Sequence, residues 1–577
     1  MRTVCATLMC VCTLAVGAGV AAAETIEMPY GELGFTAKWT SFEGEAFGTT
    51  IRCPVTLEGS FQEPGIQTTA GTPVGTVNEA RFGACTGGTA TAAVGSLPWH
   101  VRFNSFTGQL PNIASVKMNV TDAAISTVAL GLRCTIRASE AEPLKWNTTL
   151  VSYEAVATEV DPTTAIRLEG ESFCAFGGSA RMRGRSGPLL MQLGGQTVTM
   201  VQGPAANGPW VVSVGDSFIA GEAGRWASNT VSRPQVRIDR LGPRAYFDNA
   251  NATAELIPLC HRAERRANEI NFGFNGGPRG RSLACSGART TSQTIGTTFK
   301  PGLDLANPSS QANLLRDFAR AWREAGQPVR AVVVSIGGND FHFAEIITSC
   351  VASFTTGVFA YCRNDPNVTR YISPAEVATN RTAIQQALRN VHTAMINAGY
   401  LDTNYWIIVQ DYESLIPPNA ANIRYPEDLE RWARGGCPMY NTDIEWANTQ
   451  VLPLINSTVW AAYNQLEFTN IRRLEVRDAF EGRRLCETFV GLLESGGYEW
   501  WSQNNVVNDT EWVNQIRTVE GADLKRQESL HPNSWGYLAL RNCLRLAYNN
   551  GVANSGTCLR QGGGLSQFRE PIMQLVQ

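Results

Sequence analysis

Ser217 is the residue of this sequence best suited to act as a nucleophile. It follows Gly215 and Asp216 at the end of the apolar, β-branched run 211–214, which predicts a buried strand. Gly215 permits a sharp turn, and Asp216 is well placed to cap a helix that begins near Phe218. A hydroxyl at such a junction can attack a carbonyl carbon, because the oxyanion that forms then lies near backbone N–H groups without partners.

A second group of polar residues, Gly337–Asp340, follows the apolar run 332–336. The glycines allow a close approach of the backbone, and the side-chain amide of Asn339 can donate to a developing oxyanion. On its own the tetrapeptide is more typical of a strand-to-helix turn that Asn or Asp caps. Asp340 is expected to hold this turn in shape.

A serine nucleophile needs a general base, and the sequence has five histidines. His531 precedes Pro532, which disfavours helical backbone at the histidine and predicts a loop before a helix that includes 538–546. His531 is therefore the candidate base. The other four are expected to have packing or supporting roles: His100, His261, His342 and His392.

The elements after residue 210 alternate between strand-like runs and helical periodicity. Helical faces end at Gly326 and Gly399 and extend over 444–460, and strands are expected over 329–336, 406–409 and 471–476. This order predicts an α/β domain with a parallel sheet covered on both faces. Ser217 and Gly337–Asp340 both lie at carboxyl ends of strands, where sites of such sheets form, so we expect them to meet.

Residues 24–203 alternate in hydrophobicity with period two and predict an all-β domain, a sandwich or jelly roll. The expected strands include 52–61, 101–106, 116–120, 166–168 and 198–201. Trp39 and Trp146 are expected in its core rather than on a sugar-binding surface. Residues 204–209 are small and turn-forming and predict a linker to the domain at 210–577.

The net charge, the N-terminal segment and the cysteine count indicate where the protein is found and exclude nucleic acid as a partner. The chain has 577 residues and a formal net charge of −3, which gives no general attraction for nucleic acid. Residues 1–23 resemble a secretory signal peptide, and no later segment is apolar enough to span a bilayer. Of 15 cysteines, three lie in this segment, and the even remainder favours disulfides over metal sites. We expect a secreted, extracellular, soluble monomer.

Four short motifs occur in a characteristic order. Gly215-Asp216-Ser217, Gly287 within the segment 283–288, Gly337–Asp340 and His531-Pro532-Asn533 resemble the four blocks of the SGNH (GDSL-type) hydrolases. The segment 283–288 and Cys260-His261-Arg262 resemble the secreted actinobacterial lipases and esterases of that family. The resemblance covers roughly 210–577. It implies a flavodoxin-like α/β/α domain that hydrolyses carboxylic esters. The chain departs from the α/β-hydrolase elbow, because Ile219 stands where that motif has glycine.

The resemblance also implies roles for individual residues. Ser217 would be the nucleophile that forms an acyl-enzyme, and His531 would act first as general base and then as acid. The backbone N–H groups of Ser217 and Gly287, with the Asn339 side chain, would form the oxyanion hole. No metal and no organic cofactor is implied, since this chemistry needs only a base and an oxyanion hole.

The group that orients His531 has several candidates. The family often has an aspartate three residues before the histidine, where this chain has Glu528. In some relatives a main-chain carbonyl two residues before the histidine replaces the acid, which here would be that of Ser529. Glu528 is placed slightly ahead of this carbonyl, and Asp523 is a more distant candidate.

Disulfide pairs after residue 210 follow from the resemblance and from proximity. Cys260–Cys285, Cys350–Cys362 and Cys437–Cys486 resemble bridges of the secreted subgroup, and Cys543–Cys558 follows by proximity. In the β-domain, three pairings are possible for the four cysteines at 53, 85, 134 and 174.

These features predict a secreted serine esterase or lipase that acts on a lipid, a small ester or an acylated sugar. The alternatives are a carbohydrate (acetyl) esterase and a surface-binding protein whose hydrolase domain is inactive. The β-domain is the part of the chain that would contact a polysaccharide or a cell surface.

Overall fold

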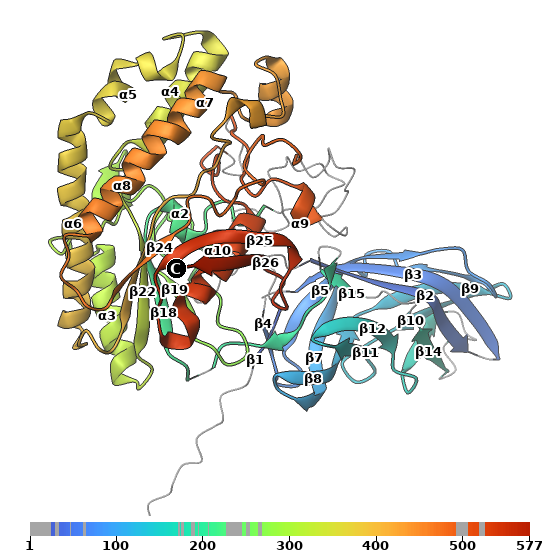
Figure 1. The fold of residues 1–577 in the computed structure, drawn as a ribbon. Coiled ribbons are helices and arrows are strands. Elements are labelled where there is room, and N and C mark those ends of the chain that lie inside the picture. Colours follow the sequence, from blue (N-terminus) through green and yellow to red (C-terminus); the bar gives the residue numbers. More distant parts are fainter. Residues whose placement is uncertain are drawn as a thin grey trace, which may run out of the picture.

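The computed structural model describes residues 25–28, 34–46, 48–61, 65–170, 174, 178–185, 191–193, 196–205, 207–226, 245–249, 254–263, 268–491, 506–518 and 526–577. The segment predicted as a signal peptide, 1–23, lies outside these residues. The chain is a mixed α/β protein with large β-sheets (Figure 1).

Antiparallel strands dominate the residues before 210. The main sheet contains β2 (Gly34–Ala46), β3 (Thr49–Phe61), β5 (Pro73–Phe82), β6 (Thr89–Ala92), β7 (Trp99–Gln109), β8 (Asn112–Thr121), β9 (Ala124–Ala129), β10 (Leu132–Arg137), β11 (Leu144–Val151), β12 (Glu154–Val160), β13 (Ala165–Gly170), β14 (Ser179–Arg185), β15 (Met191–Leu193) and β16 (Gln196–Thr197). A smaller sheet contains β1 (Thr25–Glu27), β4 (Gly65–Gln67) and β17 (Val201–Gln202).

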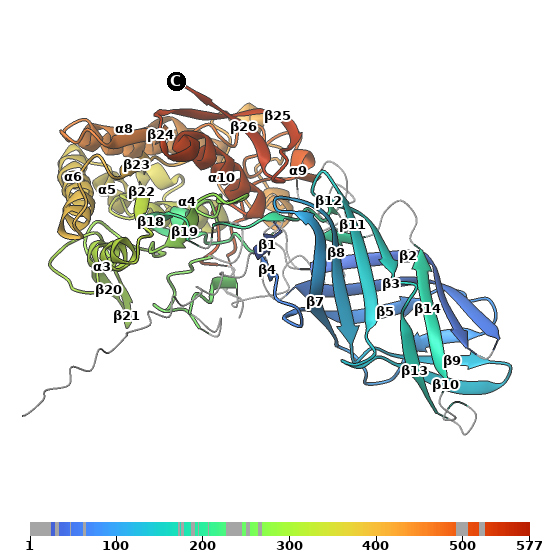
Figure 2. The ribbon, with the colours of Figure 1, turned by 90° about the horizontal axis from the view of Figure 1, so that it is seen from below.

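The main sheet closes on itself (Figures 1 and 2). β2 pairs with β3 along one edge and with β14 along the other, so the order β2-β3-β5-β7-β8-β11-β12-β14 returns to β2. The expected sandwich is corrected in this respect: the strands form a barrel with one continuous ladder, which leaves no free edge around the ring. Trp39 and Trp146 are buried in its core, as expected.

The residues from 210 onward build a second sheet and a second core. Its strands are β18 (Trp210–Gly215), β19 (Arg279–Ser282), β22 (Val329–Ser335), β23 (Trp406–Gln410), β24 (Ile471–Glu475), β25 (Gly556–Leu565) and β26 (Pro571–Val576). They are ordered β19-β18-β22-β23-β24-β25-β26, and every neighbouring pair is parallel except β25 and β26. A hairpin pairs β20 (Gln293–Ile295) with β21 (Thr298–Lys300).

Helices cover this second sheet. They are α2 (Ser217–Ala220), α3 (Gln311–Glu324), α4 (Phe343–Thr356), α5 (Pro366–Tyr371), α6 (Pro374–Asn397), α7 (Asn441–Trp446), α8 (Leu452–Tyr463), α9 (Val506–Asp509) and α10 (Ser534–Tyr548). α6 packs against both α3 and α8, whereas α10 packs against β26 across the sheet from them (Figures 1 and 2).

Local sequence signals set the ends of these helices. Ser310 caps α3 by accepting a hydrogen bond from the N–H of Asn313, and Ser373 caps α6 in the same way, with Pro374 as its first residue. The helices expected before Gly326 and Gly399 are thereby confirmed. The helix expected over 444–460 is also present, as α7 and α8 joined by a π-helical segment, Ala447–Val451.

Six disulfides link the residues that the structure describes, and four of them have the pairing that the resemblance and proximity implied: Cys260–Cys285, Cys350–Cys362, Cys437–Cys486 and Cys543–Cys558. In the barrel, Cys53 pairs with Cys85 and Cys134 with Cys174. Among the described helices, none combines the length and the apolar character that crossing a membrane requires.

Candidate active site

Ser217 begins α2, directly after β18 ends. Gly215 at the end of β18 has a φ of 142°, and a Cβ atom there would lie 1.9 Å from the carbonyl oxygen of Ser335 on β22. Only glycine fits this close approach. Asp216 caps α2 by accepting a hydrogen bond from the N–H of Phe218 at 3.1 Å, which confirms the predicted cap. The turn thus fixes the Ser217 hydroxyl at the carboxyl end of the sheet.

His531 contacts Ser217. Its Nε2 atom lies 2.8 Å from the Oγ of Ser217, although 314 residues separate them in the sequence. Its Nδ1 atom lies 2.9 Å from the carbonyl oxygen of Ser529. A carbonyl oxygen only accepts, so Nδ1 carries the ring hydrogen and Nε2 presents a lone pair to the serine hydroxyl. This is the tautomer that a general base requires.

The loop that carries His531 is held at both ends. The N–H of Asn514 donates to the carbonyl oxygen of His531 at 2.8 Å. Two residues after His531, Asn533 caps α10 by accepting hydrogen bonds from the first turn of that helix. The ring of Phe218 packs on the imidazole with ring centres 4.8 Å apart. The expected loop before a helix is confirmed, and the imidazole is held by packing as well as by hydrogen bonds.

Glu528 does not contact the imidazole. Its carboxylate accepts hydrogen bonds from three buried side chains: Arg225 (2.5 and 2.8 Å), Trp226 (2.7 Å) and Tyr246. These bonds use both of its oxygens, and Nδ1 of His531 is bound to the Ser529 carbonyl instead. The structure therefore corrects the expectation that Glu528 orients His531 and favours the carbonyl alternative. Asp523 lies outside the described residues.

Gly287 lies on a loop beside the Ser217 turn. The N–H of Cys285 donates to the carbonyl oxygen of Gly215 at 3.0 Å, which fixes this loop to the end of β18. Gly287 has a φ of 73°, a left-handed conformation that favours glycine. Within the described residues, no protein acceptor binds the backbone N–H of either Ser217 or Gly287. Both N–H groups are thus available to a ligand.

The turn at 337–340 is tied to the same loop. The side-chain amide of Asn339 donates to the carbonyl oxygen of Ala288 at 2.9 Å. Asp340 accepts hydrogen bonds from the N–H and the hydroxyl of Thr290, the latter at 2.6 Å. Asp340 therefore joins two loops, which agrees with the shaping role expected for it, while Asn339 lies next to Gly287 in the fold.

Glu222 is a residue that the sequence analysis missed. It is 1% exposed, and its Oε2 atom lies 3.7 Å from Nε2 of His531. It also contacts His261, whose Nδ1 lies 2.7 Å from Oε1. Burial would raise the pKa of Glu222, but its interactions with His261, His531 and Ser286 outweigh burial and lower the pKa to about 2. Its position just after the serine motif was the one available signal, and a lone glutamate there has no distinguishing pattern.

An apolar cavity of about 40 Å³ lies next to the nucleophile turn. Asn339 and Phe218 contribute to its wall. Most other lining side chains are apolar: Phe343, Ile347, Leu415, Ile416, Leu452, Ile455 and Leu530. The cavity can take an apolar group attached to a carbonyl near Ser217.

His261 supports this site through Glu222, whereas His100, His342 and His392 do not belong to it. His100 lies on β7, is half exposed and pairs with Asp122 at 2.8 Å, which corrects its expected role as a packing residue. His342 and His392 each stack on an aromatic ring with centres 4.0 Å apart. Their packing roles are confirmed.

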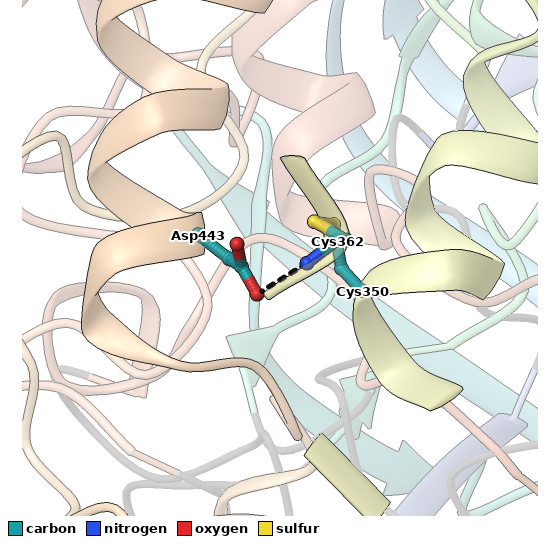
Figure 3. Close-up of side chains that lie close together, drawn as sticks. All are labelled: Cys350, Cys362 and Asp443. Atoms are coloured by element: carbon teal, nitrogen blue, oxygen red, sulfur yellow. Dashed lines mark hydrogen bonds between the residues drawn. A yellow bond between two sulfur atoms is a disulfide. The ribbon is translucent and has the colours of Figure 1, made fainter. Parts of the chain in front are cut away.

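Cys350, Cys362 and Asp443 come close enough together to be compared with a metal site (Figure 3). The two sulfur atoms are joined in a disulfide, so neither is a thiolate that binds metal. Asp443 accepts a hydrogen bond from the N–H of Cys362 at 3.1 Å. This cluster stabilises the start of a turn and does not have the donors of a metal centre.

No protein-family model and no curated protein sequence matches this chain. It is similar in structure to an extracellular lipase from Streptomyces rimosus, with 18% identity and a TM-score of 0.30, over 58% of this chain and 98% of the lipase. It is also similar to a carbohydrate esterase whose active site displays divergent catalytic and non-catalytic binding functions, with 13% identity and a TM-score of 0.22, over 68% and 91% of the two chains. Both TM-scores are low, so neither similarity carries an argument about function.

Proposed function

We propose that this protein is a serine hydrolase of carboxylic esters, a lipase or esterase of the SGNH type. The observation that carries the proposal is the chain of contacts from the Ser529 carbonyl through the His531 imidazole to the Ser217 hydroxyl. A fixed tautomer with Nε2 facing a hydroxyl is the arrangement that activates a serine nucleophile.

The proposed reaction proceeds through an acyl-enzyme. Ser217 Oγ attacks the ester carbonyl carbon while Nε2 of His531 takes the hydroxyl proton. The oxyanion receives hydrogen bonds from the N–H groups of Ser217 and Gly287 and from the amide of Asn339, which turns from Ala288 to do so. The tetrahedral intermediate then collapses, and Nε2 gives its proton to the leaving alkoxide. Water repeats these steps on the acyl-enzyme and releases the carboxylic acid.

The surroundings of the site support an acyl substrate and an exported protein. The apolar cavity beside Asn339 suits a hydrocarbon group on the acyl side of the ester. The six disulfides are typical of an oxidising compartment outside the cytosol. We assign catalysis to a flavodoxin-like domain at 210–577 and treat the β-barrel at 24–203, with the linker 204–209, as a separate domain.

The test is hydrolysis of p-nitrophenyl acetate, butyrate and octanoate by the full chain and by Ser217→Ala. The wild type should hydrolyse at least one ester and the variant should lose about 10⁴-fold or more in kcat. Ser213→Ala is the matched control, because this serine is buried on β18, just before the turn that carries Ser217, and its hydroxyl has no hydrogen-bond partner among the described residues. Equal activity in wild type and Ser217→Ala, or none in either, would refute the serine mechanism.

A further inference from the structure

A buried carboxylate, that of Glu222, lies near Nε2 of the His531 imidazole. α2 ends at Ala220, and its C-cap Gly221 has a φ of 98°, a left-handed conformation that turns the chain out of the helix. A Cβ atom on Gly221 would lie 2.8 Å from the Cβ of Ala263, so the turn is packed closely against a neighbouring loop. The turn places the Glu222 carboxylate 3.7 Å from Nε2 of His531.

Each oxygen of the Glu222 carboxylate has a specific partner. Oε1 lies 2.7 Å from Nδ1 of His261, and Oε2 accepts a hydrogen bond from the Ser286 hydroxyl at 2.5 Å. Oε2 also lies 3.7 Å from Nε2 of His531. That nitrogen is the one that receives the proton from Ser217 in the proposed reaction.

The carboxylate stays charged at this position. Burial alone would neutralise Glu222, but the neighbouring imidazoles lower its pKa. The same pairing raises the pKa of His261. Glu222 and His261 also interact with other titratable or charged side chains: Glu255, Glu528, Lys300, Tyr246, Asp216 and Tyr537.

The group at Nδ1 of His531 carries no full charge. The Ser529 carbonyl sets the tautomer and orientation of the ring, yet it offers only a dipole to the imidazolium that forms after proton transfer. In a triad with an acid, a carboxylate at Nδ1 stabilises that imidazolium. Here a carboxylate lies near Nε2 instead.

We propose that Glu222 is a positioning and charge-stabilising residue for His531, and that its carboxylate stabilises the imidazolium from the Nε2 side while the Ser529 carbonyl orients the ring. This role rests on the proposed serine-hydrolase function. His261 and Ser286 hold the carboxylate in place. The negative charge near His531 therefore comes from the turn after α2 and not from the residues just before His531 in the sequence.

Glu222→Gln tests the charge and keeps the shape of the side chain. We expect kcat for p-nitrophenyl butyrate to fall about 100-fold, because a unit charge within about 4 Å is lost in a buried site, while KM changes less than about threefold. The acidic limb of the kcat/KM profile, measured from about pH 5 to pH 9, should move to lower pH, because the variant lacks a carboxylate that favours the positively charged form of the catalytic base.

Glu255→Gln is the matched control. Oε1 of Glu255 lies 3.8 Å from Nε2 of His261, so this variant removes a neighbouring carboxylate that is one step further from the imidazole of His531. Its acidic limb and its kcat should match the wild type. Far-UV circular dichroism and stoichiometric labelling of Ser217 by an organofluorophosphate confirm that each variant is folded and has an accessible nucleophile.

A folded Glu222→Gln with wild-type kcat and an unmoved acidic limb overturns the role of Glu222 and leaves the serine mechanism standing. If the wild type itself showed no ester hydrolysis that depends on Ser217, the proposed function would be refuted instead. If Glu222→Gln does not fold, Glu222→Asp carries the test, because it keeps the charge: kcat should stay within about tenfold of the wild type. A 100-fold loss in a folded Glu222→Asp would contradict a role that depends on charge.

Discussion

Replacing Glu528 by glutamine should lower the stability of the fold and leave the chemistry of His531 intact. The Glu528 carboxylate and the Arg225 guanidinium are both fully buried and form two hydrogen bonds. Removing one charge of a buried ion pair leaves the other uncompensated, which costs about 3–5 kcal/mol. Glutamine keeps the shape and some of the hydrogen bonds, so we expect the lower value of about 3 kcal/mol and a fall in Tm of roughly 5 °C.

The assay compares thermal unfolding with kcat measured well below the transition. Glu570→Gln is the matched control, because Glu570 is also fully buried and pairs with Arg545 at 2.5 Å, on the side of the domain where α10 meets β26. Both variants should lose similar stability, and both should keep kcat within a few-fold of the wild type. A kcat loss near ~10⁴-fold in Glu528→Gln alone, with Tm unchanged, would identify Glu528 as a triad acid and refute the assignment of that role to the Ser529 carbonyl.

Three further predictions follow from the site and its buried groups. Asn339→Ala should lower kcat about 10²–10³-fold with little change in KM, since it removes one oxyanion donor. Gly215→Ala should reduce thermal stability strongly, because the new Cβ would overlap the carbonyl oxygen of Ser335. Burial raises the pKa of Asp216 to about 7 and that of Glu269 to about 8, so the folded chain keeps protons that the unfolded chain releases above about pH 4. The free energy of unfolding in urea should therefore fall between about pH 4 and pH 8, less steeply in Glu269→Gln.

Each of these predictions has an outcome that contradicts it. Unchanged kcat in a folded Asn339→Ala would remove this amide from the oxyanion hole. Wild-type Tm in Gly215→Ala would show that the strand end tolerates a side chain. An unfolding free energy that rises over the same pH range would mean that the buried acids are ionised in the folded chain.

The parts of the fold that depend on local signals were predictable from the sequence. α3 and α6 combine a serine cap with an apolar face and a terminating glycine, and each signal lies within one helix length. Ser217 and His531 were found for a similar reason, since a strand-to-helix turn and a residue before proline restrict the backbone locally.

The parts that depend on distant partners were not predictable. Closure of the barrel requires β2 to pair with β14, which follows it by more than a hundred residues, and period-two alternation is the same in a sandwich and a barrel. The Glu528 assignment failed because Arg225, its partner, is 303 residues away. Glu222 was missed because its role depends on contacts with three separate loops.

The distance in sequence between Ser217 and His531 has a consequence for the order in which the site is made. A ribosome delivers the nucleophile and its turn 314 residues before the imidazole, and the loop that carries His531 is held by the N–H of Asn514 and by the cap of α10. An unfinished chain therefore carries a serine without its proton acceptor. Ser217 and His531 therefore come together only after nearly the whole polypeptide has left the ribosome and folded. Until then, the cell that produces the protein contains no complete catalytic pair.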